Sequence, residues 1–215
     1  MATSTASDTG NVQYKVILGT VFGVIIANVA VLLRLLARRV GHVTLKLDDY
    51  LICCALIVHW GIAIAGIFLL QYGLGLPLSS GALRPVKYAQ VLFSGTFLYT
   101  MTIFFTKASI LCLYHRVFTS RIVRVPVYIV GIIICVWALV CCVAGAFLCV
   151  PLKKLWDPSV PGSCFDVTAF YVGLQIPNVV TDVAIFLLPL PAIRTLPLPS
   201  SQKWSLVAIF GVGLL

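Results

Sequence analysis

YKVILGTVFGVIIANVAVLLRLLA, residues 14–37, decides the fold of this chain. A helix needs about 20 predominantly apolar residues to cross the roughly 30 Å hydrocarbon core of a bilayer, and this run meets that length. It is too long for the apolar core of a cleavable signal peptide, and residues 1–13 before it are polar without a basic start. We therefore expect a retained transmembrane helix at 14–37, preceded by a disordered extracellular tail at 1–13.

Four more apolar runs of spanning length follow the first. The expected helices are 14–37, 47–70, 87–114, 125–149 and 167–190. A sixth run begins at Trp204 and stops at Leu215, about 18 Å of helix, which is too short to cross a bilayer. We expect that this helix continues in a longer parent protein or that the gene model is truncated in helix 6. The fold class is all-α, a polytopic transmembrane helix bundle with one membrane-embedded domain at 14–215.

The composition supports the same class. Hydrophobic residues make up 61% of the chain and charged residues 10%, against about 25% charged in a soluble domain. Such a chain cannot cover a water-facing surface, so the lipid bilayer is its expected partner. The net charge is +9, and the basic residues lie between the apolar runs. Basic residues in these positions indicate membrane topology and contact with anionic lipid headgroups, and not nucleic-acid binding.

The basic residues also predict an orientation. The loops after the first, third and fifth spans carry eight of the loop Lys and Arg residues, and the remaining loops with the N-terminal tail carry five. Because cytoplasmic loops are enriched in Lys and Arg, we expect the first loop in the cytosol and the N-terminus outside, with the plasma membrane as the location. The pair Arg38 and Arg39 contributes most to this prediction, since it follows the first span.

Two charged residues lie deep within the expected spans, where charge is costly. Lys107 and Asp182 both fall in the cytosolic half of the bundle. We propose from the sequence that they form an intramembrane ion pair. The alternative is that Lys107 extends alone to the headgroups while Asp182 takes local hydroxyl partners such as Thr181.

A second group of charges is expected at the cytosolic surface. Asp48 and Asp49 begin the second span, where carboxylates favour the positive end of the helix dipole and can cap its free amides. The functional alternative is a charge cluster in which they pair with basic residues and hold the first three helices together as a latch. The basic residues are Arg34, Arg38 and Arg116.

Cys149 and Cys164 flank the loop CVPLKKLWDPSVPGSC on the outer side. This side is oxidising, so we expect a disulfide. Its loop of about 15 residues predicts a stabilisation of about 3 kcal/mol. The alternative is two free thiols.

Gln175 and Asn178 flank Pro177, which interrupts the fifth span and is expected to kink it. These amides give the helix a polar face that either lines a ligand cavity or bonds to a neighbouring helix. His59, in the second span, is expected to be a hydrogen-bonded interior residue.

No enzyme chemistry is indicated. An intramembrane aspartyl protease needs two buried aspartates, whereas only Asp182 lies well within a span. The histidines and cysteines lack metal-ligand spacing, and no phosphate-binding glycine loop occurs. We expect no catalytic residues, no metal and no cofactor.

Several segments resemble the fungal rhodopsin-domain integral membrane proteins, which include the PTH11-like receptors and the SAT4 type. The segments are RLLARRVGHVTLKLDDYLI at 34–52, QYGLG at 71–75, FTKASILCLYHRVF at 105–118, CVPLKKLWDPSVPGSC at 149–164 and NVVTDVAIFLLPLPAIRTLPLPSSQKW at 178–204. The ordered set is specific, although DDYL alone is weak. His115 departs from the pattern because an Arg is usual there.

The resemblance implies a seven-helix, GPCR-like architecture with an outside N-terminus and no retinal. A receptor-like protein that senses an unknown ligand is the resulting functional expectation, and a G-protein α subunit is its partner only by analogy. The alternatives are a transporter or lipid-binding membrane protein, with Lys107 and Asp182 on the path, and a membrane scaffold that does not signal.

Overall fold

The computed structural model describes residues 2–42, 44–74, 85–118, 120–157 and 159–190. Nearly all of these residues are helical, with one small hairpin. The elements are α1 (Ala2–Val40), α2 (Leu47–Gln71), α3 (Pro85–Val117), α4 (Arg121–Ala146), β1 (Cys149–Val150), the 3₁₀ helix η1 (Leu152–Leu155), β2 (Ser163–Cys164) and α5 (Val167–Leu187). The all-α helix bundle is therefore confirmed. The expected sixth run and the seven-helix count lie outside the described residues.

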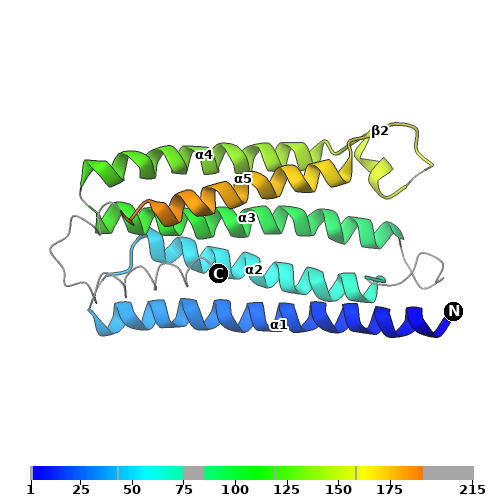
Figure 1. Ribbon diagram of the computed structural model, residues 1–215, viewed down its shortest axis with the longest axis horizontal. Helices are drawn as coiled ribbons and strands as arrows, with labels where there is room; N and C mark the ends of the chain where they lie inside the picture. Colours follow the sequence, from blue (N-terminus) through cyan, green and yellow to red (C-terminus); the bar gives the residue numbers. More distant parts are fainter. Residues whose placement is uncertain (1, 43, 75–84, 119, 158, 191–215) are drawn as a thin grey trace.

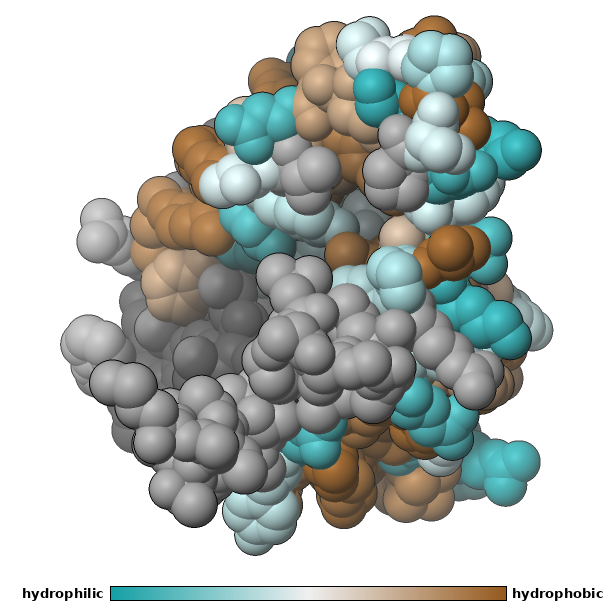
Figure 2. All heavy atoms as spheres, turned by 90° about the vertical axis from the view of Figure 1, so that its right-hand side faces the viewer, coloured by the Kyte–Doolittle hydropathy of each residue, from teal (hydrophilic) through white to brown (hydrophobic). Residues whose placement is uncertain are grey.

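The helices lie nearly parallel to one long axis (Figure 1). Consecutive helices run in opposite directions, so α1 to α4 pack in sequence order, and α5 packs against α4. Two different ends result. The helices α1, α3 and α5 finish at one end, which we call the arginine end after Arg34, Arg38 and Arg116. The opposite end carries β1, η1 and β2, and we call it the disulfide end. Figure 2 looks onto the disulfide end, where teal hydrophilic residues are mixed with hydrophobic ones.

Side-chain exposure is inverted relative to a soluble protein. Large aliphatic side chains point outward along the helices, as in Ile26, Leu33 and Leu139, each more than half exposed. The buried set includes six polar and charged side chains, which are Asp48, Asp49, Thr100, Lys107, Ser109 and Thr181. Five of the described helices are long and apolar enough to cross a membrane. Lipid is the solvent that makes this arrangement favourable, because it accepts apolar faces and excludes unpaired polar groups.

Most helix boundaries differ from the sequence prediction by one to four residues, and the start of α1 differs by more. α1 begins at Ala2, so residues 2–13 continue the helix and the expectation of a disordered tail there is corrected. Extending an existing helix costs little per residue, and no proline interrupts this stretch. α4 ends at Ala146 because the next residues enter β1, and α5 ends at Leu187 because Pro189 cannot continue the helix.

Candidate functional site

The first buried polar centre joins α3 to α5 around the ammonium of Lys107. The Nζ atom donates to the backbone oxygen of Asn178 at 2.8 Å, to its Oδ1 at 2.6 Å and to Thr181 Oγ1 at 2.7 Å. It also lies 3.0 Å from Asp182 Oδ1. The Trp137 ring of α4 is 5.9 Å from the same nitrogen, within the range of a cation–π contact.

In the structure Lys107 is buried beside Asp182, and the Thr181 hydroxyl binds Lys107 and not Asp182. Three N–H groups thus face four oxygens, so the buried ammonium is fully satisfied. The exposure is unequal: the Lys107 side chain is 5% exposed and that of Asp182 is 34% exposed. Lys107 is therefore the interior member of the pair, and Asp182 is at its edge.

The helix around Pro177 supplies these oxygens. Thr181 Oγ1 lies 2.8 Å from the backbone oxygens of both Pro177 and Asn178, as expected for a threonine that bonds back to its own helix. Proline has no N–H, so the ladder of α5 is interrupted there. The oxygens that bind Lys107 belong to Asn178 and Thr181, one and four residues after this proline.

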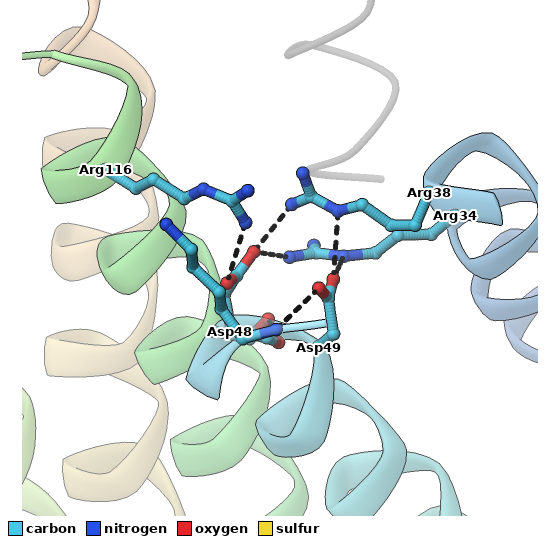
Figure 3. Close-up of polar contacts among 7 residues, drawn as sticks. Arg34, Arg38, Asp48, Asp49 and Arg116 are labelled. Carbon is cyan, nitrogen blue, oxygen red and sulfur yellow. Dashed lines mark hydrogen bonds and ion pairs between the residues drawn. The ribbon is translucent and has the colours of Figure 1, made fainter. Parts of the chain in front are cut away.

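The second polar centre lies at the arginine end, where α1 meets the start of α2 (Figure 3). Each guanidinium bridges both carboxylates. Arg34 reaches Asp48 Oδ2 at 2.9 Å through Nη2 and Asp49 Oδ1 at 3.1 Å through Nε. Arg38 makes the same two contacts at 2.7 Å and 3.3 Å. Arg34 and Arg38 share a helix face because they are four residues apart, and the planar guanidinium fork suits such bridging.

The third helix also reaches this centre. Arg116 Nη1 lies 3.5 Å from Asp48 Oδ1, without a hydrogen bond to any described residue. Ser109 Oγ, which is fully buried, donates to the backbone oxygen of Asp48 at 2.6 Å. We call Arg34, Arg38, Asp48, Asp49 and Arg116 the arginine–aspartate cluster.

Asp49 has both of the roles that the sequence could not separate. Its Oδ2 accepts a hydrogen bond from the Lys46 backbone N–H at 3.3 Å, which caps α2, while its Oδ1 binds Arg34 and Arg38. Both aspartate side chains are almost fully buried, at 3% and 2% exposed. Carboxylates this deep require such partners, because an unpaired buried charge is strongly destabilising.

The two polar centres are connected through α3. Lys107 belongs to the first and Ser109, two residues later, bonds to the second. Ser109 was not identified from the sequence, and its only signal there is a small polar residue beside Lys107 in FTKAS. A shift of α3 at either residue therefore moves the contacts of the other.

Two cavities lie beside the Lys107 centre. The smaller, about 180 Å³, is lined by Lys107, Asn178 and Asp182. Its described lining does not include Gln175, which instead exchanges hydrogen bonds with Tyr99 Oη at 3.2 and 3.1 Å. Asn178 thus has the expected cavity position, whereas Gln175 lies on the exposed side of α5.

The larger cavity, about 550 Å³, lies among α1, α2, α3 and α5 and shares Thr102 and Thr106 with the smaller one. Arg34 and His59 also line it. The buried His59 Nε2 has no hydrogen-bond partner among the described residues, which corrects the expectation of a hydrogen-bonded interior histidine. This space continues from the Lys107 centre toward the arginine end.

The disulfide between Cys149 and Cys164 is confirmed. Its two residues are direct partners across the hairpin of β1 and β2. The Trp156 ring of the enclosed loop packs edge-on against Phe93 of α3, with ring centroids 6.5 Å apart. Hydrogen bonds from Ser159 hold the pKa of Asp157 in this loop below its usual value. The Trp156 contact thus fixes the loop to the first turns of α3.

These features define a class of protein. Outward apolar faces, five helices of spanning length and paired interior charges are the properties of a polytopic integral membrane protein. The chain belongs to the fungal rhodopsin domain family, whose model matches residues 33–215. The resemblance found in the sequence is therefore confirmed.

Named relatives come from several fungi. The chain is 30% identical over 189 residues to the wortmanamides biosynthesis cluster protein C of Talaromyces wortmannii, covering 85% of this chain and 51% of that protein. It is 33% identical over 119 residues to the satratoxin biosynthesis SC1 cluster protein 4 of Stachybotrys chartarum, covering 54% and 44%. A SAT4 family membrane protein of Emericella nidulans is 32% identical over 133 residues, covering 60% and 34%.

The chain spans about half the length, or less, of these curated relatives. No solved structure matches it.

Proposed function

We propose that this protein is a receptor-like membrane protein in which a ligand at the Lys107 centre is coupled to the arginine–aspartate cluster through α3. The observation that supports this most directly is the placement of Lys107 and Ser109 two residues apart on one helix, each bonded to a different polar centre. Both centres consist of discrete contacts that are either made or broken. Such contacts can give a helix two alternative positions.

The Lys107 centre can respond to a polar ligand. An incoming carboxylate or hydroxyl that competes for Nζ would replace one of the oxygens on α5, and the 180 Å³ cavity is lined by both members of the ion pair. Losing one partner of a fully buried pair costs about 3–5 kcal/mol, and the cost is smaller here because Asp182 is one-third exposed. A ligand that compensates this cost in only one arrangement of α3 and α5 would shift the population toward that arrangement.

The proposed orientation places the arginine end in the cytosol and the N-terminus outside, at the plasma membrane. The excess of Lys and Arg in the loops at the arginine end supports it. A G-protein α subunit is the proposed partner of this basic surface, on the analogy of the receptor architecture.

Catalysis is not part of the proposal. The printed names of several relatives refer to biosynthesis clusters, so we propose that this protein also acts alongside such a cluster.

A transporter or lipid-binding protein is the second candidate. It is favoured by the two cavities that share residues beside an ionisable pair, with His59 on the wall of the larger one. Uptake into vesicles that is lost in Asp182→Asn would support transport. Ligand-dependent contact between the arginine end and a G-protein α subunit would support the receptor. If neither occurs, the third candidate, a membrane scaffold, is favoured.

The coupling itself is testable without a known ligand. Spin labels on genetically encoded residues at positions 39 and 121, both exposed at the arginine end, report the distance between α1 and α4. We expect Lys107→Met to shift this distance distribution, and Ser109→Ala added to it to reduce the shift, because the bond to Asp48 transmits the movement.

Lys87→Met is the matched control, since Lys87 lies at the start of the same helix and its ammonium packs over the Tyr72 ring. Folding is checked through the intact disulfide. If a folded Lys107→Met protein gives the same distribution as the Lys87→Met control, the proposed coupling through α3 is wrong.

A further inference from the structure

A third cavity lies at the arginine end, between the start of α2, the end of α3 and the first half of α4. At about 790 Å³ it is larger than the two cavities beside Lys107. Its polar lining residues are Lys46, Asp48, His115, Arg116, Arg124 and Tyr128. Its remaining lining is almost entirely apolar, with Leu111, Ile132 and Val136 as examples. We call this cavity the α3–α4 groove.

The groove changes from basic to apolar along the bundle axis. On α4 it runs from Arg124 to Val136, and on α3 from Arg116 back to Phe104. Each stretch corresponds to about 18 Å of helix. One leaflet contributes about half of the roughly 30 Å hydrocarbon core. The groove therefore has the length of one leaflet, with its basic mouth at headgroup depth at the arginine end.

The mouth has positive charge in excess. The six acidic residues of the chain are all aspartates, and only Asp48 and Asp49 lie at this end near the mouth. Both of these already bind Arg34 and Arg38. Two carboxylates therefore face three arginines of the cluster, and Lys46 and Arg124 add two further cations.

Arg116 has unused hydrogen-bonding capacity at this mouth. Its Nη1 atom is buried, is 3.5 Å from Asp48 Oδ1 and makes no hydrogen bond to a described residue. In Figure 3, Arg116 approaches Asp48 from the side opposite to Arg34 and Arg38. This nitrogen therefore has an anionic oxygen nearby but no acceptor at hydrogen-bonding geometry. A phosphate oxygen at the mouth would supply one.

His115 and Tyr128 complete the mouth from opposite helices. Tyr128 Oη lies 2.9 Å from His115 Nε2, and their rings meet edge-on. Tyrosine is favoured at the interface between headgroups and acyl chains, because its ring is apolar and its hydroxyl is polar. This pair thus lies where a lipid changes from headgroup to chain.

We propose that the α3–α4 groove is a binding site for one anionic phospholipid. The phosphate is held by Arg116 with Lys46 and Arg124, and the acyl chains lie along the apolar walls of α3 and α4. The side walls favour a lipid over a water-borne partner, because Ile132 and Val136 are more than half exposed in a chain whose helices are surrounded by lipid. Basic pockets between transmembrane helices suit acidic headgroups. This site is separate from the cavity at Lys107, which shares none of its lining residues, although Asp48 and Arg116 at its mouth also belong to the arginine–aspartate cluster.

The test uses native mass spectrometry of the whole detergent-solubilised protein. The probes are phosphatidic acid and phosphatidylcholine with identical acyl chains, and inorganic phosphate alone. We expect phosphatidic acid to be retained at least tenfold more tightly than phosphatidylcholine. Lys46→Gln and Arg124→Gln should each weaken its retention about fivefold, as expected for one cation near a headgroup.

Matched controls separate the site from general charge. Arg121→Gln changes an exposed arginine in the first turn of α4 that is not among the described lining residues, and Lys154→Gln changes a lysine at the disulfide end. We expect both to keep wild-type retention. Equal retention of the two lipids, or equal losses in control and groove variants, would overturn the proposal.

A second variant tests the acyl half of the groove. Gly131 lines it, and a side-chain carbon added there would come within 3.7 Å of Leu111 Cδ1. Gly131→Phe should fill the groove and abolish phosphatidic acid retention in protein whose disulfide remains intact. Binding of inorganic phosphate as tight as that of the lipid, or lipid retention unchanged in Gly131→Phe, would show that no lipid chain occupies the groove.

Discussion

Lys107 shows how one residue can hold two helices in a membrane. The sequence marked it as costly, and the structure surrounds its ammonium with oxygens from Asn178, Thr181 and Asp182. Lys107 is the more buried member of the pair, so its charge depends more on the partner than the charge of Asp182 does. Removing Asp182 leaves the Lys107 charge without its counter-ion, whereas removing Lys107 leaves a carboxylate that is one-third exposed.

A double-mutant cycle measures this pair. We expect Lys107→Met and Asp182→Asn each to destabilise the protein, and the combined variant to be less destabilised than the sum by about 1–3 kcal/mol. Unfolding in mixed detergent by chemical denaturation gives the free energies. The cycle of Lys87→Met with Asp182→Asn is the control and should be additive. Additivity in the Lys107 cycle as well would contradict an energetically significant pair.

The small hairpin at the disulfide end is the element that depends most on a single glycine. A Cβ at Gly162 would lie 2.3 Å from the backbone oxygen of Val150 and 2.8 Å from Pro151 Cδ. Both neighbours are parts of β1 or follow it directly, so neither can rotate away as a flexible side-chain tip would. Lys154 also donates to the Gly162 carbonyl from η1. The close approach at Gly162 therefore determines how β2 pairs with β1.

We expect Gly162→Ala to separate β1 from β2 and to lower the fraction of molecules with the Cys149–Cys164 disulfide. Mass spectrometry after alkylation, with and without reductant, reports that fraction. Gly95→Ala is the matched control: nothing lies within 4 Å of a Cβ added there, and alanine favours helix. Full disulfide formation in Gly162→Ala, with unchanged stability, would show that the hairpin tolerates a side chain.

At the scale of the whole molecule, the antiparallel helices fix which segments share a side of the membrane. The start of α1 and the loop between β1 and β2 lie at the disulfide end, and the turn between α1 and α2 lies at the arginine end. The loop charges predict that the arginine end faces the cytosol. The predicted orientation in the membrane therefore assigns all of these segments to one side or the other together.

Membrane-impermeant labelling of intact cells tests it. We expect epitopes placed before Ala2 and after Asp157 to be labelled from outside, and an epitope at His42 to be labelled only after permeabilisation. The disulfide end would then be in the oxidising compartment where its disulfide forms. Labelling at His42 in intact cells, without labelling at the other two sites, would reverse the orientation.

The sequence by itself determined where the spans lie and which residues are costly inside them. Length and hydropathy are sufficient for this, because each span must satisfy its own backbone and expose apolar side chains to lipid. The same reasoning identified Lys107, Asp182 and the paired charges around Asp48 and Asp49. It also identified the two cysteines that form the disulfide. These are properties that a residue has from its chemistry and its depth in the membrane.

Only the tertiary structure decided which atoms these side chains contact. Arg34 and Arg38 each bridge two carboxylates, Ser109 bonds to the backbone of another helix, and Asn178 but not Gln175 reaches the cavity. These outcomes depend on how each helix is rotated and how closely it approaches its neighbours. Rotation is set by the packing of many weakly specific apolar contacts, so no single residue encodes it. The α3–α4 groove is known only from the structure for the same reason, because its walls come from separate helices.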